Sequence, residues 1–160
     1  RRYLPDIEAL ASVPDRVESL LAHRSSAELR LPPRDNEAQQ ERVEEWSPAR
    51  TIGHLISSTR HQHERIHNMI WLTDPRFIVY DEEAEARQEG WESLDGALLL
   101  DKLSDSIAGI VNMLNDLPDA SWGRAGIHPT LGRRSIRQQV QMALEHYEEH
   151  LNQIGQALKS

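Results

Sequence analysis

The residues in this chain best suited to chemistry are two histidines four positions apart, His146 and His150. They lie within residues 135–158, where apolar side chains recur every three or four positions, as on a helix with one apolar face. Ser135 is suited to cap that helix. Residues four apart lie one turn above each other, so two imidazoles can bind one metal ion. The pair alone does not separate a metal site from ordinary histidines at the edge of a core, and two ligands do not complete a site.

A second pattern with chemical meaning is the H-E-x-x-H formed by His63, Glu64 and His67. Zincin proteases use this spacing to place two zinc ligands and a general base on one helix. The motif fixes only three residues, so chance matches are common. Its neighbours are polar and indicate a solvated helix face: Arg60, His61, Gln62, Arg65 and Asn68. We therefore interpret the motif as a coincidence.

The elements that must position these residues are helices. Ser47 followed by Pro48 predicts a helix start, and the helix should run to about Leu72 with His54 at the margin of its apolar face. By itself, His54 is more typical of a structural histidine than of a ligand. A first helix is expected to begin at Pro14. A third is expected from Ser93, as its cap, to about residue 117.

Two connections stand out. The long acidic stretch 73–92 contains Asp81 and is a candidate lid, because loops of this length usually carry function or cover something. The Gly- and Pro-rich stretch 123–134 carries His128, whose expected role is hydrogen bonding within the loop. The charged stretch 34–45 should be exposed to solvent. No convincing strand pair is present, so the sequence predicts an all-α four-helix bundle with long connections, as one domain over residues 1–160.

Composition excludes several classes of partner. The chain has 18 Lys and Arg against 26 Asp and Glu, a net charge of -8, and no clustered basic residues, which argues against nucleic acid. No apolar run approaches the roughly 20 residues that span a bilayer. There are no cysteines, so disulfides, thiolate ligands and a cysteine nucleophile are excluded. Together with the lack of a visible secretory signal, this leads us to expect a cytoplasmic protein.

Three segments carry a resemblance to a known family. They are W-S-P-A-R-T-I-G-H-L at 46–55, R-A-G-I-H-P-T-L-G at 124–132 and H-Y-E-E-H-L-N-Q-I at 146–154. In this order and spacing the sequence resembles the DinB/YfiT-like superfamily of four-helix metalloproteins. The resemblance implies that His54, His146 and His150 bind one divalent metal ion, with Zn or Ni favoured and Fe as a further candidate.

The sequence also departs from that family. Related sequences often read H-L-x-D-x-E after the first histidine, whereas Ser57 and Thr59 occupy the acidic positions here. Glu85 stands where an aromatic residue is common. The three histidines are retained, while the residues around them and the substrate contacts are expected to differ.

Two functional hypotheses follow. Family relatives include S-transferases and isomerases that use low-molecular-weight thiols, so the first is a metal-dependent transferase or hydrolase acting on a small molecule. Asp81, His128 and Glu149 are then candidate general bases or orienting groups. The second is a non-catalytic metal-binding bundle, such as a stress or ligand-sensing homodimer. An open coordination position at the floor of a pocket would favour the enzyme.

Overall fold

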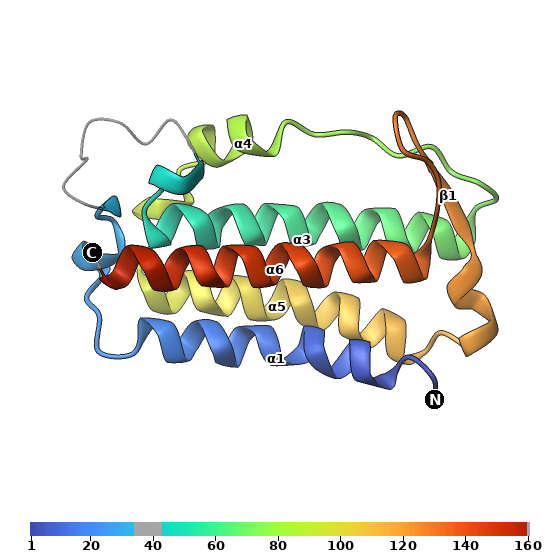
Figure 1. The fold of residues 1–160 in the computed structure, drawn as a ribbon, viewed down its shortest axis with the longest axis horizontal. Coiled ribbons are helices and arrows are strands. Elements are labelled where there is room, and N and C mark those ends of the chain that lie inside the picture. Colours follow the sequence, from blue (N-terminus) through green and yellow to red (C-terminus); the bar gives the residue numbers. More distant parts are fainter. Residues whose placement is uncertain (34–42, 160) are drawn as a thin grey trace.

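In the computed structural model, which describes residues 1–33 and 43–159, four long helices pack side by side as a bundle (Figure 1). They are α1 (Leu4–Leu21), α3 (Pro48–Trp71), α5 (Gly96–Asn115) and α6 (Ile136–Lys159). α3 packs against α5 and α6, and α1 packs against the same two helices from the other side. The predicted four-helix bundle is confirmed.

The order of helix directions explains the longest connection. In Figure 1, α3 and α5 run the same way, and α1 and α6 run the opposite way. The chain must therefore return along α3, whose 24 residues span about 36 Å, before α5 can begin. We call residues 72–95 the crossover. It carries α4 (Glu82–Gln88) and the 3-10 turn Trp91–Ser93, and both pack against α3.

The core is formed where the long helices face one another. α1 contributes Leu10 and Val17, and α3 contributes Ile52 and Leu55, all with 1% exposure or less. Trp46, just before α3, is also buried. Among the described residues, no helix combines the length and apolarity needed to cross a bilayer.

A short hairpin corrects the expectation that no strand pair is present. β1 (Ala125–His128) pairs antiparallel with β2 (Gly132–Ser135), and Gly132 has a positive φ of 76° at the turn. Strands of four residues are too short to show a reliable alternation in sequence. Phe77 of the crossover donates its N–H to the Ile127 carbonyl at 2.9 Å. The hairpin thus anchors the start of the crossover.

Two predicted helix starts are confirmed by their caps. Ser47 accepts a hydrogen bond from the Arg50 N–H at 3.2 Å, and Ser135 accepts one from the Gln138 N–H at 3.1 Å. These side chains satisfy amide groups that a helix leaves unpaired in its first turn.

Two other predicted starts are wrong. α1 begins at Leu4 and Pro14 lies inside it, because the helix buries Val13 just before the proline and Val17 just after it. α5 begins after Asp95, since Ser93 belongs to the preceding 3-10 turn, where its hydroxyl donates to the Gly90 carbonyl. Most of the charged stretch 34–45 lies outside the described residues; Val43–Glu45 form a 3-10 turn. The remaining short helical segments are α2 (Ser26–Leu29) and the 3-10 turn Asp119–Gly123.

Candidate metal centre

Three histidines from two antiparallel helices meet at one point. His54 of α3 faces His146 and His150 of α6, and their nearest ring nitrogens all lie within 4.8 Å of one another. The Nε2 atoms of His54 and His146 are 3.2 Å apart, and those of His146 and His150 are 3.0 Å apart. His54 is 5% exposed and His150 is 4% exposed. The cluster is therefore closed on the side of the bundle core.

The protonation of these rings fits a bound cation. Burial, with neighbouring His150 and His146, lowers the pKa of His54 to about 3. Burial and His150 lower the pKa of His146 to about 4. Each neutral imidazole keeps one nitrogen lone pair, and in the Nδ1–H tautomer all three rings can direct that lone pair at one cation. Two nitrogens each about 2.1 Å from one tetrahedral ion lie about 3.4 Å apart, close to the observed separations.

Gln153 orients one of the three rings. Nδ1 of His150 is 2.8 Å from Oε1 of Gln153, and a carbonyl oxygen only accepts, so Nδ1 carries the proton. The lone pair of His150 is thereby left on Nε2, the nitrogen that faces His146. Gln153 in turn donates its amide to the Val43 carbonyl. Sequence reasoning missed Gln153, although its position three residues after His150 on one helix was a usable signal.

The histidine cluster lies in the wall of a cavity of about 730 Å³. One stripe of α3 lines it with His54, Ser58, Gln62 and Arg65, at helical spacing. The crossover, the hairpin and α6 complete the wall, and contribute Val79, Tyr80, Glu82, Leu131, Met142 and Tyr147 among others. Gln62 and Arg65 were predicted to lie on a solvated face. They line the cavity instead, because the crossover covers that side of α3.

Comparison with known proteins identifies the family. The chain matches the DinB superfamily over residues 9–154. It belongs to the DinB superfamily. Among solved structures, one similar chain is YfiT from Bacillus subtilis, described as a probable metal-dependent hydrolase with an unusual four-helix bundle topology. The TM-score is 0.83 at 19% identity, covering 97% of this chain and 85% of YfiT. No curated protein matches the sequence.

The three candidate catalytic residues of this DinB-superfamily chain all line the same cavity. Asp81 is exposed, and its carboxylate accepts the Ala84 N–H at 3.0 Å, which caps α4. Glu149 is exposed as well. Burial lowers the pKa of His150, while Gln153 and the charge of Glu149 act in the opposite direction. Glu149 therefore adds negative charge beside the histidine cluster.

His128 has a defined tautomer. Its Nδ1 accepts the backbone N–H groups of Thr130 and Leu131 at 3.1 and 3.0 Å, which confirms the predicted hydrogen bonding within its loop. The proton of the neutral ring must then lie on Nε2. Burial, Arg65 and Arg134 lower the pKa of His128. The neutral ring suits a hydrogen-bond donor better than a general base.

Glu82 is a cavity residue that the sequence did not single out within the run of three acidic residues 81–83. It is half-buried, and burial raises the pKa of its carboxyl, an effect partly offset by His61, Arg65 and Ser58. No local sequence signal distinguishes it from Asp81 or the residue that follows it, because only the tertiary fold decides which carboxylate turns inward.

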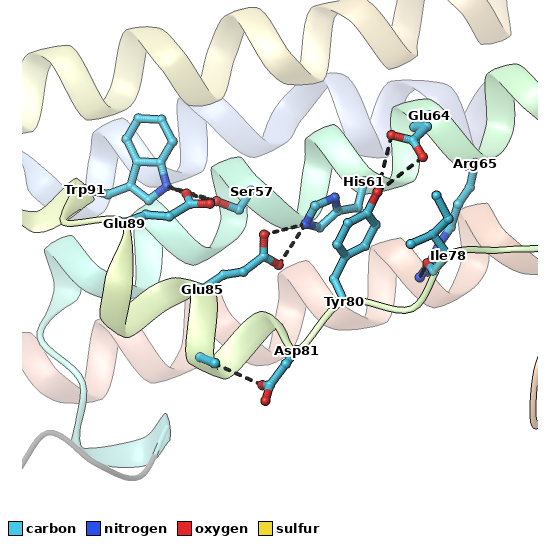
Figure 2. A network of polar contacts seen from close by, with 11 residues as sticks. Ser57, His61, Glu64, Arg65, Ile78, Tyr80, Asp81, Glu85, Glu89 and Trp91 are labelled. Carbon is cyan, nitrogen blue, oxygen red and sulfur yellow. Dashed lines mark hydrogen bonds and ion pairs between the residues drawn. The ribbon is translucent and has the colours of Figure 1, made fainter.

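The positions that depart from the family pattern contact the crossover or the buried centre. In Figure 2, Ser57 donates its hydroxyl to Glu89 at 2.7 Å, and His61 lies 2.9 Å from Glu85. The His61 ring also stacks on Tyr80, with centroids 3.6 Å apart. The Thr59 hydroxyl donates to the Leu55 carbonyl and must therefore accept from Tyr147.

The residues of the H-E-x-x-H motif make contacts outside the histidine cluster. His63 and His67 take no part in the histidine cluster found among the described residues. Glu64 accepts the Tyr80 hydroxyl at 3.3 Å, and His67 lies 6.5 Å from Trp71, centroid to centroid. Glu64 contacts the crossover, and neither histidine of the motif joins the cluster, which supports the interpretation that its zincin spacing is a coincidence.

Proposed function

We propose that this protein is a metal-dependent enzyme that hydrolyses a small molecule or transfers a group between a small molecule and a low-molecular-weight thiol. The observation that carries the proposal is the convergence of His54, His146 and His150 in the wall of a cavity of about 730 Å³. Cavities of this size suit small molecules. A divalent ion, Zn or Ni with Fe as a further candidate, would supply Lewis acidity that activates water or a thiol.

The chain's own residues would bind, orient and shield the reactants. Because there is no cysteine, a sulfur nucleophile must enter as a substrate. His128 would orient the substrate by donating a hydrogen bond from its Nε2–H. Glu149 would add negative charge beside the histidine cluster. Burial raises the pKa of Tyr147 to about 12, so its hydroxyl stays protonated and committed to Thr59. The crossover around Asp81 would exclude bulk water.

The similarity to YfiT, itself described as a probable metal-dependent hydrolase, supports the hydrolase form of this proposal. The alternative is a metal-binding bundle without catalysis. The position of the histidine cluster in a cavity wall favours the enzyme, since a reactant can approach the cluster there.

The test combines metal analysis with a reactivity screen. Protein loaded separately with Zn, Ni or Fe would be assayed against hydrolysable esters, amides and other electrophiles, with and without low-molecular-weight thiols. We expect a rate above the metal-free protein that is lost on chelation and in His54→Ala, and kept in His63→Ala. Stoichiometric metal without any rate above buffer would favour the non-catalytic alternative.

A further inference from the structure

We propose that Glu82, rather than Asp81, is the catalytic residue that accepts and returns a proton in this cavity. The inference rests on the proposed function and deepens it, because it assigns the proton transfer to a named carboxylate. Both residues lie at the start of α4 and both line the cavity. The difference between them lies in what each carboxylate contacts.

Asp81 is committed to the backbone. Its Oδ1 accepts the Ala84 N–H at 3.0 Å, and the side chain is exposed. In Figure 2 the Asp81 carboxylate lies at the start of α4, and the Glu85 carboxylate lies between it and His61. Removing it from that position would cost α4 its cap.

Glu82 is turned toward α3. Its side chain is half-buried and lies beside Ser58, which helps to lower the pKa of the Glu82 carboxyl. Ser58 is 5% exposed and lies one helical turn after His54 on the stripe of α3 that lines the cavity. Glu82 is therefore held beside the same wall that carries the histidine cluster.

The groups facing Glu82 come from three helices. α3 presents Ser58, His61 and Arg65, α4 presents Glu85, and α6 presents Tyr147, whose own pKa the charge of Glu82 helps to raise. Burial is the largest influence and raises the pKa of Glu82, while His61, Arg65 and Ser58 oppose it. A half-buried carboxyl that lines the cavity and has a raised pKa is suited to accept and return a proton.

The proton transfer balances without any further reactant. As water or a thiol attacks the electrophilic carbon, its proton passes to the Glu82 carboxylate and the new O–C or S–C bond forms. The bond from that carbon to the leaving group then breaks, and Glu82 returns the proton to the leaving group. The carboxylate ends each cycle ionised.

The first test compares two neighbouring carboxylates by the same substitution. We expect Glu82→Gln to lower kcat by about 10²- to 10⁴-fold with wild-type metal content and little change in KM. Glu83→Gln is the matched control, because Glu83 is exposed and paired with Arg87 at 3.5 Å. A kcat for Glu82→Gln equal to that of the control would overturn the assignment.

The second test does not depend on turnover. The carboxyl ¹³C resonance of Glu82, assigned by its loss in Glu82→Gln, would be titrated with and without zinc. We expect a midpoint above the ordinary value of 4.5 without metal, a higher midpoint in Ser58→Ala, and a lower midpoint once zinc is bound.

The outcomes separate this inference from the proposed function. A protein that fails to bind zinc contradicts the proposed metal site itself. Bound zinc that leaves the Glu82 midpoint unmoved overturns the role of Glu82 alone. Bound zinc and a responsive Glu82, with no turnover of any electrophile, also overturn the catalytic role and favour the non-catalytic bundle.

Discussion

Gln153 fixes the ring of His150: Oε1 of the amide accepts the Nδ1 proton at 2.8 Å, one turn further along α6. The imidazole therefore presents its Nε2 lone pair to the centre of the histidine cluster. Such hydrogen bonds to ligand histidines set both tautomer and orientation.

Replacing that amide should weaken metal binding. We expect Gln153→Ala to raise the dissociation constant for zinc about 10- to 100-fold, because the ring is freed to rotate and to change tautomer. Calorimetric titration would measure it. The exposed Gln156 of the same helix offers the control, and Gln156→Ala should bind zinc like wild type. Equal affinity in the two variants would contradict the role given to Gln153.

The ligands themselves are tested by removing the pair on α6. We expect the double variant His146→Ala/His150→Ala to lose bound metal, because one histidine does not hold a divalent ion. Elemental analysis would show the loss. Full occupancy in that variant would defeat the assignment.

The residues of the H-E-x-x-H motif should not contribute to metal binding. We expect Glu64→Gln and His67→Ala to keep wild-type metal content, since neither side chain belongs to the cluster. Loss of metal in His67→Ala, with helicity unchanged by circular dichroism, would revive the zincin interpretation.

The metal-free protein should lose stability in acid through His54. Its pKa is 6.5 ordinarily and about 3 in the folded protein. Below pH 6.5 this histidine binds a proton in the unfolded chain but stays neutral in the folded protein. The free energy of unfolding therefore falls as pH falls toward 3. The slope from this group is at most about 1.4 kcal/mol per pH unit. Urea unfolding between pH 7 and 4 would measure it, and His54→Gln should show a shallower dependence. An unchanged slope in that variant would refute the prediction.

Gly53 permits the crossover to lie close to α3. An added Cβ would collide with the Trp91 side chain at its Cβ, which is near the crossover backbone. We expect Gly53→Ala to cost about 1–3 kcal/mol of unfolding free energy and to disturb the Trp91–Ser57 hydrogen bond of 2.9 Å. Thermal unfolding with tryptophan fluorescence would report both. Gly123→Ala meets no atom within 4 Å and should change stability by less than about 0.5 kcal/mol. Similar unfolding midpoints for the two variants would contradict this account.

Local sequence signals were sufficient to predict the two helices that carry the histidine cluster. Ser47, Ser135 and the apolar periodicity predicted α3 and α6, and the family resemblance selected the three histidines that the fold brings together. The start of α1 was predicted wrongly because Pro14 was interpreted as a first helical position from its local propensity alone. In the protein the helix runs through Pro14 and buries Val13 and Val17 on either side of it.

The missed residues depend on tertiary contacts. Asp81 and Glu82 are neighbours with similar chemistry, and the direction of each carboxylate is decided by how α4 lies on α3. The hairpin escaped notice because each of its strands is four residues long and its partner in the crossover is far away in sequence.

The separation of His54 from His146 by 92 positions also bears on how the protein is made. At about 5–20 residues per second, the second histidine leaves the ribosome roughly 5–20 s after the first. Until α6 docks, the nascent chain presents only one of the three nitrogens. The proposed metal ion can therefore contact all three histidines only after α6 has been synthesised and has docked on α3.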